Sequence, residues 1–513
     1  MNESKIPVLI GVGQFTDRSD SANGLTPTAM MAQAARRAAD DSGSKHILKH
    51  VDVLAAAGLT VDAEQVKTPV SGLINNVPRA VAKQLGISPM RYVYSESGGD
   101  TPQRMVNYFA QEVAQGRSQA VLLTGGEAMH TMRLKFNHWS KLLWPKGGWK
   151  DKSGTKPTSF GDERLGSNRH EDKYAMNLPT QVYPLFENAL RAHNGREPAE
   201  HMRHIAKMFS GFTKVAAKNP YAWLQNERSA EELITTNQQN RMIAYPYPKW
   251  LNSMLFVNQS AALIITSVEK AKSLGVSQDR MVYLHGYADG YDIWNVSERA
   301  NFYSSTVMKT LGSSAMQMAG IDIDDVSVFD IYSCFPSAVQ IACDALGLAH
   351  DDERGLTLTG GMPYFGGPGN NYNMHAIAEM VAWARSHPSE YGLLNGNGWY
   401  LTKHAFGVYS ATPPNAEFRV STSDSMENVS ANTRSRVNLK KNMLGAAKIE
   451  TYTVIYDKSN CPQRAIIVAR NDHNRCLATS DNSSKTLDRL LEGEAVGRQG
   501  ELIKRGRYTE FVF

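Results

Sequence analysis

The chain has 513 residues, of which 42% are hydrophobic and 20% charged, so it is long enough for two or three globular domains. Its 55 basic and 50 acidic residues give a formal net charge of +5, which excludes the dense basic character of a nucleic-acid-binding protein. Four cysteines without a C-x-x-C pair exclude a disulfide framework, and no apolar run approaches the roughly 18 residues of a membrane span. With no secretory signal and no peroxisomal address, we expect a cytoplasmic protein.

The first 125 residues alternate between apolar strands and amphipathic helices. The patterns predict strands at 7–15, 51–57, 91–95 and 120–125, and helices at 26–39, 76–85 and 102–114. This alternation is typical of a doubly wound α/β unit with a parallel sheet.

Residues 127 to about 250 break the alternation and are predicted to form an inserted loop domain. Within it, residues 133–156 carry seven basic residues against the single acid Asp151, so this segment either meets phosphates or is a solvated basic loop. His201 and His204 form an H-x-x-H pair on a helical pattern. Because no acidic or third ligand lies nearby, we interpret them as surface histidines and expect no metal site.

The alternation returns after the insertion, which predicts a second α/β half. Expected strands are 261–266, 281–288, 325–330, 392–397 and 400–409, and expected helices are 268–274, 301–318, 337–346 and 376–385. The repeated element order indicates a duplicated architecture, with one half at 1–260, including the insertion, and the other at 261–414.

Residues 415–513 are predicted to form a separate all-β domain. Its expected strands are 418–422, 449–456, 464–469, 475–479 and 508–513. Short strands separated by polar turns favour a compact barrel of the oligonucleotide/oligosaccharide-binding (OB) kind. Its cations are expected to serve solubility rather than binding, and they are Arg434, Arg436, Lys440, Lys441 and Lys448.

A glycine-rich loop at 360–375 holds five glycines, two prolines and three asparagines, directly before an apolar helical pattern. Glycine allows close approach, so main-chain amides of this loop could face an anion or a polarised carbonyl oxygen. The alternative is a turn that needs glycine for its shape alone.

Five segments together carry a family resemblance. They are Ser-Gly-Gly-Asp-Thr-Pro-Gln at 97–103, Val-Asn-Gln-Ser-Ala-Ala at 257–262, Asp-Ile-Tyr-Ser-Cys-Phe-Pro-Ser at 330–337, the glycine-rich loop, and Leu-Thr-Lys-His at 401–404. In their order and spacing the chain resembles the thiolase superfamily. It looks most like the type 1 thiolase-like proteins, often labelled acetyl-CoA acetyltransferases, that carry an additional C-terminal β domain. The resemblance implies a duplicated thiolase fold in α/β/α/β/α layers, with a loop-domain insertion and a C-terminal OB-like barrel.

The resemblance also locates the catalytic positions of thiolases, and the nucleophile is missing here. Thiolases use a cysteine at a helix N-terminus as the acyl acceptor. That position corresponds to Gly99, or to Ser95 or Ser97 if a gap is allowed.

The other three positions differ as well. The asparagine or histidine of the thiolase N-E-A-F or H-D-C-F motif corresponds to Tyr332, and the histidine of the G-H-P motif corresponds to Gly367 in Gly366-Gly367-Pro368. The second cysteine falls near residues 395–397. Losing one oxyanion-hole donor costs on the order of 10²–10³ in rate. We therefore doubt ordinary thiolase chemistry, and we expect the loop to shape the pocket with backbone amides and Asn370 or Asn371.

Four residues remain as catalytic candidates, namely Tyr332, Ser333, Cys334 and His404. His404 is either a general base or a structural histidine that bonds a carbonyl, and Cys334 is either reactive or a buried inert thiol. Candidate substrate-binding residues are Gly99, Asn252, Ser253, Asn258, Gly366, Gly367 and Asn370.

Three functions are compatible with this set. The resemblance implies an acyl-CoA-dependent acyltransferase of lipid metabolism that lacks the usual Cys/His/Cys set and uses coenzyme A or acyl-CoA without a covalently bound cofactor. The alternatives are a non-catalytic acyl-CoA or lipid-thioester binding protein, and a scaffold for a partner acyl-CoA enzyme. Association is expected either as a homodimer through the thiolase core, which the C-terminal addition could block, or with such a partner enzyme.

Overall fold

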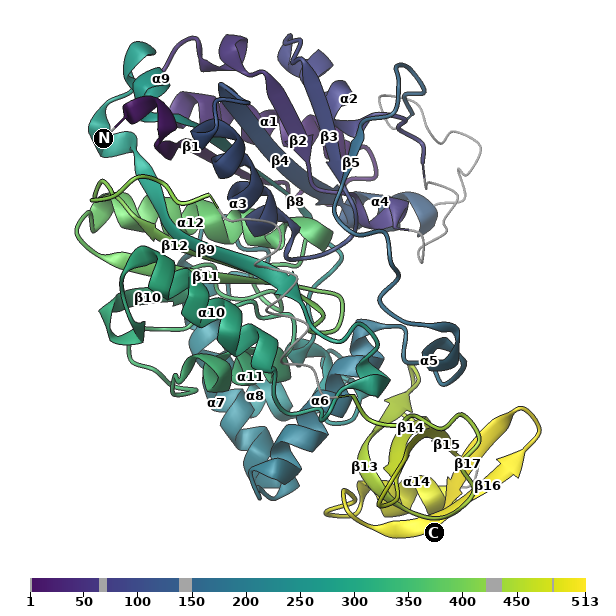
Figure 1. The fold of residues 1–513 in the computed structure, drawn as a ribbon. Helices are drawn as coiled ribbons and strands as arrows, with labels where there is room; N and C mark the ends of the chain where they lie inside the picture. The colour runs from purple at the N-terminus through teal and green to yellow at the C-terminus, as the bar shows by residue number, and fades with distance from the viewer. Residues whose placement is uncertain (1, 64–71, 138–149, 421–435, 482–483) are drawn as a thin grey trace.

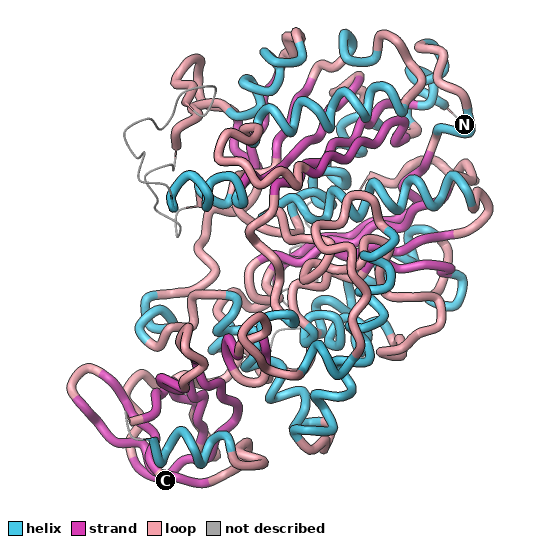
Figure 2. The backbone as a smooth tube through the Cα atoms, turned by 180° about the vertical axis from the view of Figure 1, so that it is seen from behind, coloured by secondary structure: helices cyan, strands magenta, loops and turns pink. Residues whose placement is uncertain are grey.

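The structure is a computed structural model that describes residues 2–63, 72–137, 150–420, 436–481 and 484–513. The two α/β halves lie one above the other in Figure 1, and a small barrel, drawn in yellow, lies at one corner of the molecule. Figure 2 shows the same arrangement from behind, with the barrel strands at the C-terminal end set apart from the strands of the main body.

The first half combines five strands with outer and inner helices. Its strands are β1 (Pro7–Thr16), β2 (Val53–Ala56), β3 (Arg91–Ser95), β4 (Ala120–Ala128) and β8 (Asn258–Ser267), and its helices are α1 (Pro27–Asp41), α2 (Val77–Leu85), α3 (Thr101–Ala114) and α9 (Val268–Ser273). The prediction of a parallel sheet is wrong in part. β2 runs parallel to β3 and β4, but β8 runs antiparallel to both β1 and β4 because it enters the sheet from the insertion and not from a crossover helix.

The second half repeats this order with one strand fewer. Its strands are β9 (Val282–Tyr291), β10 (Val326–Asp330), β11 (Tyr391–Gly398) and β12 (Lys403–Ser410), and its helices are α10 (Thr306–Ala319), α11 (Pro336–Leu346) and α12 (Tyr372–Ser386). β12 is antiparallel to β9 and β11, and β11 is parallel to β10. The same pairings occur in the first half, where β8 corresponds to β12, β1 to β9, β4 to β11 and β2 to β10. The duplicated architecture is confirmed. The expected boundary at 260 falls inside β8, because that strand belongs entirely to the first half.

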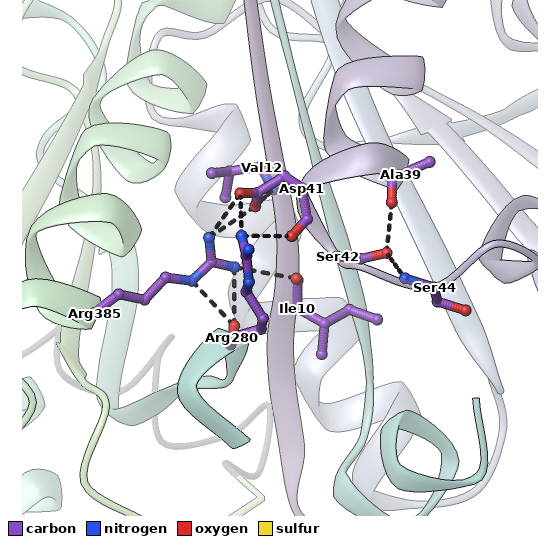
Figure 3. Close-up of polar contacts among 8 residues, drawn as sticks. All are labelled: Ile10, Val12, Ala39, Asp41, Ser42, Ser44, Arg280 and Arg385. Atoms are coloured by element: carbon purple, nitrogen blue, oxygen red, sulfur yellow. Dashed lines mark hydrogen bonds and ion pairs between the residues drawn. The ribbon is translucent and has the colours of Figure 1, made fainter. Parts of the chain in front are cut away.

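Helices α3 and α12 form the middle layer, since each contacts strands of both halves. The ion pair between Arg385 and Asp41 joins the two halves at the end of this layer (Figure 3). Arg385, at the C-terminal end of α12, donates from Nη1 to both carboxylate oxygens of Asp41 at 3.0 and 2.8 Å. Asp41 ends α1 and also accepts from the backbone amide of Val12 at 2.8 Å. The side chains of α1 and α12 therefore tie the N-terminal strand to the second half.

The inserted domain is mostly helical in the residues that the structure describes. It contains α4 (Met129–Asn137), β5 (Thr158–Phe160), α5 (Arg169–Lys173), α6 (Pro179–His193), α7 (Pro198–Lys218), α8 (Ala230–Ile234), β6 (Met242–Ala244) and β7 (Tyr247–Pro248). β5 adds to the edge of the first half by pairing in parallel with β3. Much of the basic segment 133–156 lies outside the described residues.

The interpretation of His201 as a surface residue is wrong. Its side chain is fully buried and Nε2 bonds Glu187, which also accepts from Gln340 Nε2 at 2.7 Å. His204 instead pairs with His350, Nε2 to Nδ1, at 2.9 Å. Among the residues that the structure describes, no group of three His, Cys, Asp or Glu side chains is arranged to hold a metal ion. None of the described helices has the length and apolar character needed to cross a membrane.

The C-terminal region is a closed five-stranded barrel. Its elements are β13 (Gly445–Tyr456), β14 (Pro462–Arg470), β15 (Arg475–Ser480), α14 (Ser484–Leu491), β16 (Gln499–Arg505) and β17 (Tyr508–Val512). Closure follows from the order β14-β15-β17-β16-β13 together with the β13–β14 pairing. The predicted strand at 418–422 is not formed at 418–420, and its last two residues lie outside the described chain, as does Arg434. β16 and α14 were not predicted.

The barrel is fastened to the insertion. β6 pairs with β13 through Ala244 and Ile455, so the insertion extends the barrel's sheet. Thr451 Oγ1 donates to the carbonyl of Leu185 at 2.6 Å, and Asn188 Nδ2 donates to the carbonyl of Tyr452 at 2.9 Å. These hydrogen bonds connect the barrel directly to α6 across a buried interface.

Candidate functional site

A cavity of about 660 Å³ lies where both halves meet the insertion. Its walls come from the turn before α3, the turn after β10, the glycine-rich loop, the β11–β12 turn and the start of α6. The lining residues are Thr60, Ala63, Ser97, Gly98, Gly99, Leu165, Asp172, Asn177, Leu178, Pro179, Thr180, Tyr183, Ser253, Leu255, Tyr332, Cys334, Phe335, Met362, Gly367, Gly369, Asn370, Asn397, Trp399 and Tyr400. Six of the predicted site residues are among them, namely Gly99, Ser253, Tyr332, Cys334, Gly367 and Asn370.

The phenol of Tyr332 occupies the space that a side chain at residue 99 would need. A Cβ built on Gly99 would lie 1.8 Å from Tyr332 Oη and 2.6 Å from the carbonyl oxygen of Asn397. Heavy atoms cannot approach so closely, so no nucleophilic side chain fits at residue 99 unless Tyr332 moves. Of the two alternative positions, Ser95 is buried and its Oγ accepts from the Gly58 amide at 2.9 Å, whereas Ser97 is one of the residues that line the cavity.

Cys334 is the cysteine that lines the cavity, and its thiol is held neutral. Burial raises the pKa of the Cys334 thiol to about 12. Its Sγ accepts from Asn397 Nδ2 at 3.9 Å, and the same Nδ2 donates to Tyr183 Oη at 2.9 Å. Since the thiolate is the nucleophilic form, Cys334 is a poor acyl acceptor near neutral pH.

The glycine-rich loop turns its amides inward. The amide of Gly367 donates to the carbonyl of Met254 at 2.8 Å, and the amide of Gly369 donates to the carbonyl of Gly367 at 2.7 Å. Gly366 and Gly369 have φ angles of 116° and 54°, which side chains rarely adopt. The amides of Gly367 and Gly369 therefore serve the shape of the turn, and the expectation that they face a ligand is wrong at these two positions.

Asn370 links this loop to the turn before α3. Its Oδ1 accepts from the Gly98 amide at 2.9 Å, and its Nδ2 donates to the carbonyl of Gly58 at 2.7 Å. The side chain thereby orients Gly98 and Gly99. Asn371 is not one of the cavity residues, and within the described structure neither polar atom of its amide has a hydrogen-bond partner.

Five predicted site residues lie away from the cavity wall. His404 is fully buried on β12, and burial lowers the pKa of its imidazole to about 4. Ser333 Oγ accepts from the Met362 amide at 3.2 Å, Asn252 Nδ2 donates to the carbonyl of Pro248 at 2.8 Å, and Asn258 Oδ1 accepts from the Thr131 amide at 3.0 Å. Gly366 lies against Gln259. Each makes backbone or packing contacts in this structure, and none lines the cavity.

Comparison with known proteins agrees with the fold. A family model described as "Thiolase-like protein type 1 additional C-terminal domain" matches residues 428–507. The crystal structure of a monomeric SCP2-thiolase-like protein type 1 from Mycobacterium smegmatis is similar over 99% of both chains, with 34% sequence identity and a TM-score of 0.82. The chain belongs to the SCP2-thiolase-like proteins of type 1.

Two more distant relatives carry thiolase activities in their names. The acetyl-CoA acetyltransferase of Methanocaldococcus jannaschii is 27% identical over 140 residues, which are 27% of this chain and 34% of that protein, so the chain spans about a third of this curated relative. The human mitochondrial 3-ketoacyl-CoA thiolase in complex with CoA is 15% identical, with a TM-score of 0.52 over 79% of this chain and 98% of that one. At this identity the likeness concerns the fold alone.

In this type 1 thiolase-like protein, aromatic residues that the sequence did not single out form much of the cavity wall. Tyr183 stacks on Phe335 with ring centroids 4.5 Å apart, and it also lies edge-on to Tyr400 at 6.5 Å, next to Trp399. Tyr183 comes from the helical insertion, where no sequence signal pointed to the site. Trp399 and Tyr400 directly follow the region matched to the second cysteine, which is the signal that could have found them.

The charge of the cavity is nearly neutral. Among the lining residues that the structure describes, Asp172 is the one ionisable carboxylate and none is basic. Lys403 lies beneath the turn before α3, where Nζ donates to the carbonyls of Ser97 at 2.9 Å and Asp162 at 3.2 Å. Asn397 adds a buried Oδ1 that has no hydrogen-bond partner within the described residues. The wall therefore combines apolar surface with a few neutral donors and acceptors.

Proposed function

We propose that this type 1 thiolase-like protein binds an acyl-CoA thioester in the cavity without forming an acyl-cysteine intermediate. The observation that carries the proposal is the contact between Gly99 and Tyr332. The position where thiolases hold their nucleophile has no side chain, and the space beside it is filled by a phenol. Covalent acyl transfer needs an activated nucleophile, whereas binding needs only the pocket.

The walls suit an acyl group and the neutral arm of a thioester. A volume of about 660 Å³ lies within the range of about 300–1,000 Å³ for small-molecule pockets. Tyr183, Phe335, Trp399 and Tyr400 supply apolar surface, and Tyr332 Oη and Asn397 can bond a carbonyl oxygen or an amide. Because the described lining has no basic residue, the phosphates of CoA would lie outside the cavity.

Acyl transfer remains the second candidate because of Cys334. Its thiol lines the same cavity, beside Asn397, at a site where a bound thioester would be near. Transfer to this thiol would require a base to remove its proton, and the raised pKa makes that step costly at neutral pH. A role beside a partner acyl-CoA enzyme is compatible with binding but has no separate support from the cavity.

Titration calorimetry with CoA, acetyl-CoA and palmitoyl-CoA tests the proposal, followed by intact-mass analysis of each mixture. We expect binding of palmitoyl-CoA with no added mass on the protein. Absence of binding at millimolar acetyl-CoA and at soluble palmitoyl-CoA concentrations would overturn the proposal. An acyl adduct on Cys334 would overturn the proposal of binding without an acyl-cysteine intermediate and would support acyl transfer.

A substitution in the glycine-rich loop locates the ligand. A Cβ at Gly367 would lie 2.3 Å from Ser253 Oγ, a side-chain end that can rotate away, so Gly367→His can place an imidazole in the cavity. We expect Gly367→His to weaken palmitoyl-CoA binding by about tenfold or more, equivalent to about 1.4 kcal/mol. Gly211→His is the matched control, because a Cβ at Gly211 on α7 meets no atom within 4 Å. Equal affinities in the two variants would place the ligand elsewhere.

A further inference from the structure

The cavity wall at residues 399–402 has a backbone conformation that side chains rarely adopt. Trp399 and Leu401 have φ angles of 55° and 54°, in the left-handed region that favours glycine. Bulky residues remain there only when the surrounding structure holds them in place. Trp399 and Tyr400 both line the cavity, so whatever holds this turn also sets the shape of the cavity.

Arg299 holds the turn from behind. Its side chain is 5% exposed, and its Nη1 donates to the carbonyl of Tyr400 at 2.8 Å while Nη2 donates to Thr402 Oγ1 at 2.8 Å. Nε donates to the carbonyl of Ile293 at 2.9 Å, which fixes the plane of the guanidinium. Tyr183 Oη adds a bond to the carbonyl of Trp399 at 2.9 Å. The guanidinium therefore bridges two residues of the strained turn.

The segment that carries Arg299 is held in turn by the C-terminal barrel. Arg475 on β15 is 1% exposed, and its Nη1 donates to the carbonyls of Ser297, at 3.0 Å, and Arg299. Its Nη2 donates to the carbonyl of Ala300 at 3.3 Å. Glu450 on β13 orients this guanidinium by accepting from Nε at 2.7 Å.

A second contact joins the same two parts. Arg436 Nη1 bonds Glu298 Oε2 at 2.8 Å, and the amide of Val437 donates to the carbonyl of Glu298 at 3.1 Å. Residues 297–300 thus lie between the barrel on one side and the turn at 399–402 on the other. The contacts form one continuous chain from β15 to the cavity.

We propose that the additional C-terminal barrel positions the wall of the cavity. Arg475 and Arg436 hold residues 297–300, and Arg299 then holds Tyr400 and Thr402 in the strained turn. Arg475 and Arg299 are positioning residues, since neither lines the cavity. The consequence for ligand affinity rests on the proposed function, but the mechanical coupling does not.

Hydrogen exchange of the full chain tests the coupling with a matched pair of variants. Arg475→Lys keeps the charge and removes the forked bonds to residues 297–300. Arg470→Lys is the control, because Arg470 shares Glu450 at 3.5 Å, is 44% exposed, and makes no bond to residues 297–300 among the contacts of the described chain. We expect amides of the peptide 398–402 to exchange about tenfold faster or more in Arg475→Lys, with the amides of β14 unchanged, and no change in Arg470→Lys.

Two results would overturn the proposal. One is unchanged exchange at 398–402 in a folded Arg475→Lys, and the other is equal acceleration in both variants. If Arg475→Lys does not fold, Thr402→Val removes the Oγ1 that accepts from Arg299 and leaves the barrel untouched, and Thr402→Ser restores it. Faster exchange at 398–402 in Thr402→Val but not in Thr402→Ser is then required for the link between Arg299 and the turn. Arg436→Gln, which removes the bond to Glu298 at a side chain that is 62% exposed, must also speed exchange at 398–402 for the link to the barrel to hold.

Ligand binding separates this proposal from the proposed function. If the wild-type chain binds palmitoyl-CoA, we expect Arg475→Lys to weaken that binding about fivefold or more and Arg470→Lys to leave it unchanged. If the wild-type chain binds no acyl-CoA, the proposed function fails, and the exchange measurement still decides whether the barrel positions the turn.

Discussion

The backbone of Gly99 lies against the ring of Tyr332, and this single contact belongs to both halves of the molecule. We expect Gly99→Ala to lower the free energy of unfolding by about 1–3 kcal/mol, because the added methyl group overpacks the contact. In a Tyr332→Leu background the same substitution should cost less, since leucine has no phenol at that place and the close approach to the carbonyl of Asn397 is what remains. Urea denaturation of the four proteins of this double-mutant cycle measures the difference. Equal costs in both backgrounds would contradict the contact.

The thiol of Cys334 gives a second prediction, which depends on pH. Its pKa is raised from about 9 to about 12 by burial, so burial of the neutral thiol stabilises the folded state fully below pH 9, and this contribution is lost as the pH rises toward 12. At pH 8 we expect iodoacetamide to modify the exposed Cys461 at least about 10²-fold faster than Cys334. Peptide mass spectrometry over time measures both rates. Cys343, buried in α11 with a raised thiol pKa, is the internal control for slow reaction.

At the scale of single residues, the sequence predicted which catalytic side chains are missing better than which side chains fill their places. The lack of cysteine at residue 99 and of histidine at residue 367 is visible in the sequence. The phenol at residue 99 could not be predicted, because Tyr332 is 233 positions away and reaches it across the junction of the halves. His404 was proposed as a base from its neighbourhood in the chain, but its side chain is fully buried on β12 and does not line the cavity, although its cross-strand partner Asn397 does.

The ion pair at the ends of α1 and α12 is the element-scale contact with the clearest energetic consequence. Arg385 is 13% exposed at its side chain, and besides Asp41 it donates to the carbonyls of Ile10 at 3.1 Å and Arg280 at 2.8 Å. We expect Arg385→Met to lower the free energy of unfolding by about 3–5 kcal/mol, because Asp41 then keeps a partly buried charge without its main partner. Arg280 also faces Asp41, at 3.4 Å, but is 44% exposed, so Arg280→Met should cost about 0–1 kcal/mol.

Chemical denaturation of the two arginine variants gives this comparison directly. A similar loss of unfolding free energy in both variants would mean that Arg385 acts only as a charge near Asp41. Its buried position between the two helices would then add nothing. A negligible cost for Arg385→Met would mean that the halves do not depend on this tie.

Most elements of the α/β body could be predicted, because their apolar periodicity is strong. The errors have physical causes. The antiparallel course of β8 is set by its entry from the insertion, which local periodicity does not report. β16 was missed because Leu502 is its one buried residue and polar or charged residues make up most of the strand. β6 and β7 are too short for a pattern. The glycine-rich loop was located correctly, but whether its amides face a ligand depends on Met254, a contact from another part of the chain.

At the scale of the whole molecule, the duplicated thiolase fold and the C-terminal barrel were predictable, whereas the attachment of the barrel was not. The attachment is made by side chains of α6 and β13 that are distant in sequence, such as Asn188 and Thr451. The cytoplasmic location and the choice between a homodimer and a partner enzyme stay predictions.

Because the boundary between barrel and body is buried and hydrogen-bonded, we expect both to unfold in one cooperative thermal transition. Arg191 strengthens the boundary through a forked pair with Glu494, with Nη2 to Oε1 at 2.7 Å, and β6 continues the barrel's sheet into the insertion. The combined variant Asn188→Ala/Thr451→Val removes one donor from each side of this boundary, at a cost of about 1–3 kcal/mol for each group left unpaired. Its calorimetric trace should shift to lower temperature and broaden or split, as the barrel uncouples from the body. The surface variant Asp472→Ala, at an exposed residue of the β14–β15 turn, should leave the trace unchanged. A wild-type trace with two separate transitions would show that the barrel unfolds independently of the body. That result would weaken the proposal that the barrel positions the cavity wall.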